Sequence, residues 1–109
     1  MMNMLNHVEY YLTESGRCPF TEWLNGLRDK ATTNRIRARI TRVSLGGFGA
    51  VEAFGQGVSE LKLDFGAGYR LYCAMSEKTV VLLLIGGDKS TQQRDIEMAQ
   101  GYWKDYQAR

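Results

Sequence analysis

Three basic residues in the second half of the chain have the type and spacing of a phosphate site. Lys62, Arg70 and Lys89 each lie near the end of a segment whose pattern predicts a β-strand. If these segments pair as consecutive hairpins, the three side chains meet at one end of the same sheet. Long cationic side chains gathered in this way favour an anion such as a nucleic-acid phosphate. The sequence therefore predicts an anion site made of these three residues.

The strands that hold these residues are predicted from alternation. Apolar and polar residues alternate over residues 60–65 and again over residues 70–75, which is typical of half-buried strands. The apolar run Val80–Ile85 predicts a third strand that is covered on both faces. Tyr72 lies on the cationic face of the second strand, where an aromatic ring is a candidate to stack on a base.

Hairpin geometry sets the expected register of the first two of these strands. If Gly66–Gly68 is a three-residue loop, Asp64 faces Arg70 and Lys62 faces Tyr72. This register also offers a second explanation of Arg70, because a cross-strand ion pair with Asp64 needs no function. Lys62 can likewise be an ordinary solvated lysine, so only the meeting of several cations favours a functional site.

The beginning of the last predicted helix adds further groups to the same end of the sheet. Gly86 and Gly87 precede this helix, and Ser90 or Thr91 can cap it. Free backbone N–H groups at a helix start attract anions, so we expect them to reinforce the cationic site. Gln92, in the first turn, is a further candidate contact to RNA.

A second basic surface is predicted on a helix in the first half of the chain. Arg35, Arg39 and Arg42 recur at helical spacing, and no acidic residue lies between Arg35 and Arg42. A polyanion such as RNA, or an acidic protein, can dock on such a stripe. Plain solvation of an outward helix face explains the same arginines equally well.

The remaining patterns predict a small α+β domain. The expected elements, in chain order, are a strand over Asn6–Thr13, a helix over Pro19–Lys30, a second helix capped by Thr32 or Thr33, a glycine-rich loop over Gly46–Gly57, the three strands and the last helix. The order is therefore βααβββα, with a mainly antiparallel curved sheet and a helical hairpin packed on it.

Composition sets limits on the class of protein. The chain has 109 residues, of which 44% are hydrophobic, so we expect a single domain that covers residues 1–109. The apolar run Val80–Ile85 is far shorter than the roughly 20 residues of a membrane helix. Met1–Asn6 has no basic segment followed by an apolar one, so we expect a cytoplasmic protein.

Other motifs are weak, and none of them predicts a metal or a cofactor. Cys18 and Cys73 lack metal-ligand spacing and are interpreted as small hydrophobic residues. The segment Gly86–Thr91 lacks the full glycine frame of a nucleotide-binding loop. His7 is the single histidine of the chain, so a pair of catalytic histidines is excluded.

Two stretches of the sequence resemble a known family. GVSELKLDFGAGYRLYC, at residues 57–73, and LLLIGGDKSTQQRDIEMA, at residues 82–99, are similar to the RelE/HigB toxin superfamily of bacterial addiction modules, including its phage-derived HigB-like members. The resemblance implies the fold of that superfamily. It also implies a ribosome-dependent endoribonuclease that cuts messenger RNA in the ribosomal A site and thereby inhibits translation.

The resemblance assigns roles to the three basic residues. By position, Lys62 is the candidate base for the ribose 2′-hydroxyl, Arg70 the clamp for the transition state, and Lys89 the group that holds phosphate or assists departure of the 5′ oxygen. Many relatives have a tyrosine or histidine early in the last helix. This chain has Gln92, Gln93 and Asp95 in the corresponding region.

The resemblance also implies partners and leaves alternatives open. The expected partners are mRNA, the ribosome and a cognate antitoxin. The antitoxin is expected to be a helix-turn-helix protein through which DNA is contacted only indirectly, and no membrane is expected to be involved. One alternative is an inhibitor like the ParE branch of the superfamily, which binds gyrase without catalysis. Another is an inactive remnant that binds RNA or a partner.

Overall fold

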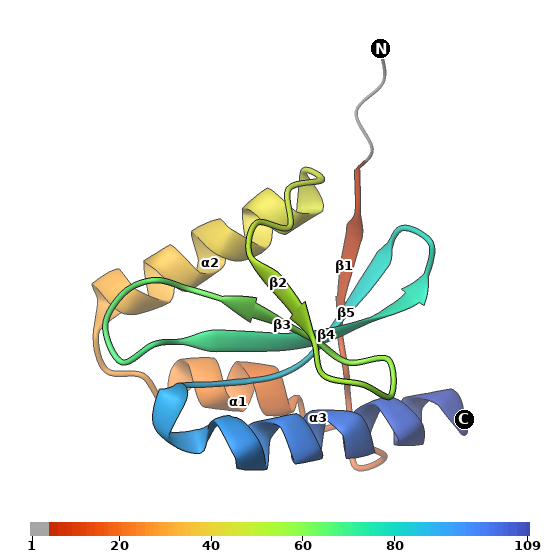
Figure 1. The fold of residues 1–109 in the computed structure, drawn as a ribbon. Coiled ribbons are helices and arrows are strands. Elements are labelled where there is room, and N and C mark those ends of the chain that lie inside the picture. Colours follow the sequence, from red (N-terminus) through yellow and green to blue (C-terminus); the bar gives the residue numbers. More distant parts are fainter. Residues whose placement is uncertain (1–4) are drawn as a thin grey trace.

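The computed structural model describes residues 5–109 and contains a five-stranded mixed sheet with three α-helices (Figure 1). The elements, in chain order, are β1 (His7–Tyr10), α1 (Pro19–Asn25), α2 (Lys30–Ser44), β2 (Val51–Ala53), β3 (Ser59–Lys62), β4 (Arg70–Glu77), β5 (Val80–Gly87), a short 3₁₀ helix η1 (Lys89–Thr91) and α3 (Gln92–Gln107). The α+β class and the single domain are as the sequence predicts.

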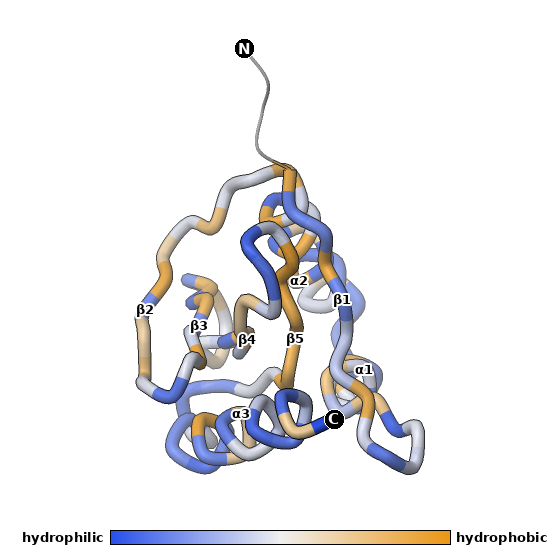
Figure 2. The backbone as a smooth tube through the Cα atoms, turned by 90° about the vertical axis from the view of Figure 1, so that its right-hand side faces the viewer, coloured by the Kyte–Doolittle hydropathy of each residue, from blue (hydrophilic) through white to orange (hydrophobic). Residues whose placement is uncertain are grey.

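The sheet has the strand order β1-β5-β4-β3-β2. β1 runs parallel to β5, and the other neighbouring pairs are antiparallel. β5 is almost entirely buried, and its continuous apolar colour in Figure 2 lies between the helices that flank the sheet. The prediction that Val80–Ile85 is a strand covered on both faces is therefore confirmed.

Two apolar cores lie on the two faces of the sheet. On one face, Phe20 and Leu24 of α1 and Ile36 and Val43 of α2 pack against the strands. On the other face, α3 supplies Ile96 and Ala99, together with the partly buried rings of Tyr102, Trp103 and Tyr106. Because each helix buries an apolar stripe, the sheet is held between α1 and α2 on one side and α3 on the other (Figure 1).

The boundary between the first two helices differs from the expected one. α1 ends at Asn25, before the expected end at Lys30, and Lys30 is instead the first residue of α2. The cap of α2 is Asp29 rather than Thr32 or Thr33: the Asp29 carboxylate accepts a hydrogen bond from the Ala31 N–H at 3.1 Å. Thr32 supports this cap by donating its hydroxyl to Asp29 at 2.9 Å.

The predicted order βααβββα is wrong by one strand, because part of the glycine-rich segment Gly46–Gly57 forms β2. This strand pairs with β3 at the sheet edge, with Val51 opposite Leu61 and Ala53 opposite Ser59. All three residues of β2 are exposed. A strand that is held by backbone hydrogen bonds alone leaves no apolar periodicity in the sequence, which is why the pattern predicted a loop there.

The register of the β3–β4 hairpin also differs from the expected one. Lys62 faces Arg70 and Glu60 faces Tyr72, whereas a three-residue loop placed Lys62 opposite Tyr72. The pairing continues one step further, because the Leu63 N–H donates to the Tyr69 carbonyl at 2.9 Å. The turn is therefore longer than the predicted one. Since the shift is an even number of residues, the side chains keep the faces that the alternation predicted.

The first strand is shorter than the sequence predicts. β1 ends at Tyr10, so the predicted strand over Asn6–Thr13 is too long. Most of the segment Met1–Asn6, for which the sequence predicts no leader, lies outside the described residues.

Both cysteines are free, and Cys73 is buried while Cys18 is partly exposed. Over residues 5–109, none of the helices has the length and apolar character needed to cross a membrane.

Candidate nucleic-acid interface

Three strands bring the predicted basic residues to one end of the sheet. Lys62, the last residue of β3, lies directly opposite Arg70, the first residue of β4. Arg70 in turn lies opposite Gly87, the last residue of β5, and Lys89 follows two positions later. The sheet topology therefore places the backbones of all three basic residues around the beginning of β4.

Gly68 links Arg70 to Lys89. The Lys89 N–H donates to the Ala67 carbonyl at 3.2 Å, and Arg70 Nη1 donates to the Gly68 carbonyl at 2.7 Å. A Cβ atom added to Gly68 would lie 3.2 Å from Arg70 Nη1 and 3.3 Å from Lys89 Cβ. The close approach of these two basic residues thus depends on a glycine between them, whose φ of 74° also favours this residue type.

Arg70 differs from the two lysines in its burial and in its partner. Its side chain is 7% exposed and its Nε atom lies 3.3 Å from Glu60 Oε2. The ion pair that the sequence suggested, with Asp64, is therefore wrong, and Glu60 takes that place. Lys62 and Lys89 are exposed. The site thus combines one fixed, buried guanidinium with two lysines that reach into solvent.

The carboxylate of Glu60, on β3, accepts hydrogen bonds from two other elements. Its Oε2 atom accepts from the Tyr72 hydroxyl at 3.0 Å and from the Gln92 side-chain amide at 2.9 Å, besides facing Arg70. Glu60 is 3% exposed. This network joins β3, β4 and the first turn of α3 behind the basic residues. Sequence reasoning missed Glu60, because its importance follows from the register rather than from any motif.

The network contradicts the predicted stacking of a base on Tyr72 and gives Gln92 a partner within the protein. Tyr72 is 0% exposed, so its ring has no free face on which a base could stack. Burial, together with the Glu60 carboxylate, raises the pKa of Tyr72, so its hydroxyl stays protonated and donates to that carboxylate. The Gln92 amide is committed to the same carboxylate. Both residues therefore hold the site together from within.

The beginning of the last helical segment is capped by the chain itself. The Asp88 carboxylate accepts from the Ser90 N–H at 2.8 Å and from the Ser90 hydroxyl at 2.6 Å. Asp88 thus occupies the position at which free N–H groups were expected to attract an external anion. Asp88 is the N-cap residue of η1 and forms a capping box with Thr91. Thr91, one of the two predicted caps, is the N-cap residue of α3, although its side chain makes no capping hydrogen bond to that helix.

Gly86 and Gly87 serve close packing, not flexibility. A Cβ atom on Gly86 would lie 2.2 Å from ring carbons of Trp23, and one on Gly87 would lie 1.7 Å from Asp95 Oδ2. Asp95 is 1% exposed and accepts the Thr91 hydroxyl at 2.5 Å. These contacts fix the direction in which the chain leaves β5 and hence the position of Lys89.

The arginines of α2 divide into two kinds. Arg39 is 7% exposed, and its guanidinium donates to the carbonyl oxygens of Phe48 and Ala50. Burial lowers the pKa of Arg39, and the nearby charge of Arg42 acts in the same direction. Arg35 and Arg42 are exposed. The predicted stripe therefore keeps two exposed arginines, while Arg39 anchors the segment that leads into β2.

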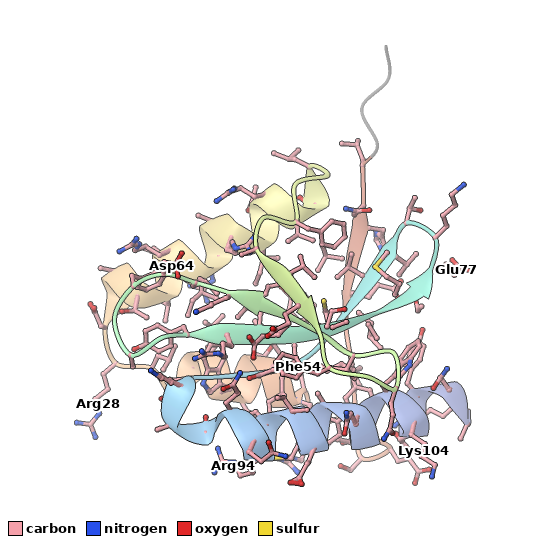
Figure 3. All side chains as sticks on the ribbon, viewed as in Figure 1. Arg28, Phe54, Asp64, Glu77, Arg94 and Lys104 are labelled. Carbon is pink, nitrogen blue, oxygen red and sulfur yellow. The ribbon has the colours of Figure 1, made fainter. Side chains whose placement is uncertain are left out.

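A cleft of about 460 Å³ separates this part of α2 from the connection between β3 and β4. Its lining residues are Arg35, Ala38, Arg39, Arg42, Gly49, Ala50, Lys62, Leu63, Asp64 and Phe65. Figure 3 labels Asp64 on this connection, beside α2. Lys62 belongs both to the cleft and to the group of basic residues at the end of the sheet. The two predicted basic regions are thus neighbours in the folded chain.

The described residues contain no cluster of three or more His, Cys, Asp or Glu side chains arranged to hold a metal ion. The groups at the end of the sheet are cations, which bind anions rather than metal ions. The chemistry that this arrangement offers is recognition of a phosphate and stabilisation of added negative charge on it.

Comparison with known proteins relates this chain to a bacterial protein. None of the known family models matches the sequence. An uncharacterized protein from Haemophilus influenzae is 42% identical to the chain over 81 residues, which make up 74% of this chain and 82% of the Haemophilus protein. At this identity and coverage the two sequences share a fold and an ancestor. The chain therefore belongs to the same family as this Haemophilus protein.

Proposed function

We propose that this protein is the toxin of a type II toxin–antitoxin module with a RelE/HigB-like fold, and that it acts in the cytoplasm as a ribosome-dependent mRNA endoribonuclease. The observation that carries the proposal is the pairing of Lys62 with Arg70 at the end of the sheet, with Lys89 reached through the contact at Gly68. We infer that a single RNA phosphodiester contacts all three side chains.

The proposed reaction is an internal transfer of the phosphodiester. The ribose 2′-oxygen attacks phosphorus, the bond from phosphorus to the 5′ oxygen breaks, and the products end in a 2′,3′-cyclic phosphate and a 5′-hydroxyl. Lys62 is the base that accepts the proton of the 2′-hydroxyl, and Lys89 is the acid that donates a proton to the departing 5′ oxygen. Exchange of protons with solvent restores both lysines.

Arg70 supplies the fixed charge in this scheme. Its guanidinium is always protonated and can donate two parallel hydrogen bonds to phosphate oxygens. The contacts with Glu60 and with the Gly68 carbonyl hold it before the substrate arrives, so little reorganisation is needed when negative charge grows on the phosphorane. The remaining barrier is lowered by positioning, and binding in the ribosome can hold the RNA in line for attack.

A cognate antitoxin is part of this proposal. An exposed cationic site that is toxic when free needs a partner to neutralise it, and a helix-turn-helix antitoxin would do so while also binding DNA. The chain would then contact DNA only through that partner.

One observation favours the alternative of a non-catalytic inhibitor of gyrase. Arg70 is buried and paired with Glu60, which is also the geometry of an arginine that only stabilises the fold. In that case the lysines would serve binding, and toxicity would leave messenger RNA intact.

Induced expression in bacteria separates these possibilities. Lys62→Ala should relieve growth arrest and remove the new 5′ ends on transcripts, because positioned acid–base groups contribute about 10²-fold or more to rate. Lys78→Ala, in the exposed turn after β4, is the matched control and should remain toxic. Growth arrest without new transcript ends, undiminished in Lys62→Ala, would support the gyrase inhibitor instead.

A further inference from the structure

The cleft between α2 and the β3–β4 connection carries a strong charge imbalance. Four of its lining residues are cationic, namely Arg35, Arg39, Arg42 and Lys62, and Asp64 is the single acidic one. In the described part of the chain neither Arg35 nor Arg42 forms an ion pair with a carboxylate within 4.0 Å. Their charges are therefore available to an anion that enters the cleft.

The wall opposite α2 adds an aromatic surface. The Arg35 guanidinium carbon lies 3.9 Å from the centre of the Phe65 ring, which is a stacked cation–π contact. A nucleobase can use the same flat surfaces, because both an aromatic ring and a guanidinium plane stack on bases. The cleft thus offers charge for a phosphate and a flat apolar surface for a base.

The cleft has a rigid floor and a suitable size. Arg39 is held by two carbonyl oxygens, from Phe48 and Ala50, so it keeps its position without a ligand. The volume of about 460 Å³ falls in the range of roughly 300–1,000 Å³ that is typical of small-ligand sites. One nucleotide fits such a space.

Lys62 connects this cleft to the proposed cleavage site. It lines the cleft, and it is the direct cross-strand neighbour of Arg70. Directly opposed residues have Cα atoms about 4.5–5.5 Å apart, which is less than the length of one nucleotide. An RNA strand whose phosphate lies at Arg70 therefore reaches the cleft with its adjacent nucleotide.

We propose that the cleft is a nucleotide subsite that binds the residue next to the cleaved phosphodiester. Arg42 holds its phosphate, and its base lies against Phe65 and Arg35. This inference rests on the proposed function only in taking RNA as the ligand. Recognition by the cleft does not require that cleavage occurs.

The test measures binding of a short RNA that cannot be cleaved. A fluorescent oligonucleotide with 2′-O-methyl riboses is titrated with the protein at several salt concentrations, and anisotropy gives the affinity. Arg42→Gln should weaken binding about five- to tenfold and reduce the salt slope by about 0.7, the value for one lost phosphate contact to a single strand. Arg35→Gln, which removes a stacking partner of the base, should weaken binding about five- to tenfold.

Arg37→Gln is the matched control, because Arg37 is an exposed arginine of the same helix that does not line the cleft. It should bind the oligonucleotide within about twofold of the parent protein. Phe65→Leu keeps an apolar side chain of similar size but removes the ring. It should weaken binding without changing the salt slope, because stacking involves no counterion release.

Several outcomes would overturn the inference. Equal losses in the Arg37 and Arg42 variants would mean diffuse attraction by net charge, and unchanged binding in both cleft variants would mean that RNA does not occupy the cleft. Binding of an oligoglutamate peptide, but not RNA, with the same dependence on Arg35 and Arg42 would assign the cleft to an acidic protein. Binding with the predicted pattern by a protein that never cleaves RNA would retain the subsite and reject only the proposed reaction.

Discussion

Glu60 is the buried residue on which the geometry of the basic site depends. Its carboxylate faces Arg70 and accepts hydrogen bonds from Tyr72 and Gln92, which belong to different elements. A buried guanidinium without a counter-charge is strongly unfavourable, so the position of Arg70 requires this acid. Arg70 Nε has no well-aligned hydrogen-bond acceptor within the described residues, so the pair is held by charge rather than by ideal geometry.

Glu60→Gln should destabilise the protein by about 3 kcal/mol, because it removes the negative charge and leaves Arg70 buried without compensation. Urea denaturation followed by circular dichroism measures this change. Glu52→Gln, on the exposed strand β2, is the control and should change stability by less than about 0.5 kcal/mol. Equal stability of the Glu60 variant and the parent would show that the ion pair does not stabilise the fold.

The basic residues of the site were predictable from the sequence, whereas their partners were not. Lys62, Arg70 and Lys89 lie next to turns, where simple hairpin pairing already brings them together. Tyr72 was assigned to the wrong role because alternation tells which face a residue is on but not whether a helix covers that face. α3 covers it here, with Gln92 above Glu60.

At the scale of elements, side chains at the end of α3 contact the segment that follows β1. The Tyr11 hydroxyl donates to Asp105 Oδ2 at 2.6 Å, and Arg109 donates to the same oxygen at 2.6 Å. The Tyr11 ring also stacks on Tyr102 with 4.9 Å between centroids. These contacts join residues that are far apart in sequence and keep α3 on its face of the sheet.

The stability provided by this contact should depend on pH in a defined way. The hydrogen bond from Tyr11 holds the pKa of Asp105 below its ordinary 3.8, so the contribution is complete above that pH and is lost as pH falls through the lowered value. Burial, followed by the hydrogen bond to Asp105, raises the pKa of Tyr11 from 10.0 to about 12, so the contribution is lost again as pH rises through that range.

Asp105→Asn tests this dependence. Compared with the parent, the variant should unfold at lower urea concentration between about pH 5 and 9, and the difference should shrink as the parent is titrated below pH 4. Glu97→Gln, at an exposed position of the same helix, is the control and should show no such pattern. A difference that stays constant down to pH 2 would contradict the assignment of the contact to the ionised carboxylate.

The long elements were predictable because apolar periodicity marks them. Val80–Ile85 and the stripe of α3 place their apolar residues against the cores as expected. β2 and the exact hairpin register were not predictable, since both depend on backbone hydrogen bonds and on turn length. Lys62 pairs with Arg70 and not with Tyr72, which changes its cross-strand neighbour but not the face of the sheet on which it lies.

At the scale of the whole molecule, two polar regions lie at different parts of the sheet. The face under α3 carries the buried acid network, and the edge near α2 carries the cationic cleft. Lys62 lies where these regions meet. The formal net charge is only +2, so the proposed affinity for RNA would come from this local arrangement and not from an overall basic surface.

The most direct test of the proposed function is the chemistry of the RNA ends. Purified protein is added to ribosomes programmed with a defined mRNA, in buffer that contains enough magnesium for the ribosome, and the fragments are analysed by mass spectrometry. The account predicts fragments with a 2′,3′-cyclic phosphate and a 5′-hydroxyl, formed at least about 10²-fold more slowly by Lys62→Ala and unchanged by Lys78→Ala. Intact mRNA with the parent protein, or fragments with a 3′-hydroxyl and a 5′-phosphate, would contradict it.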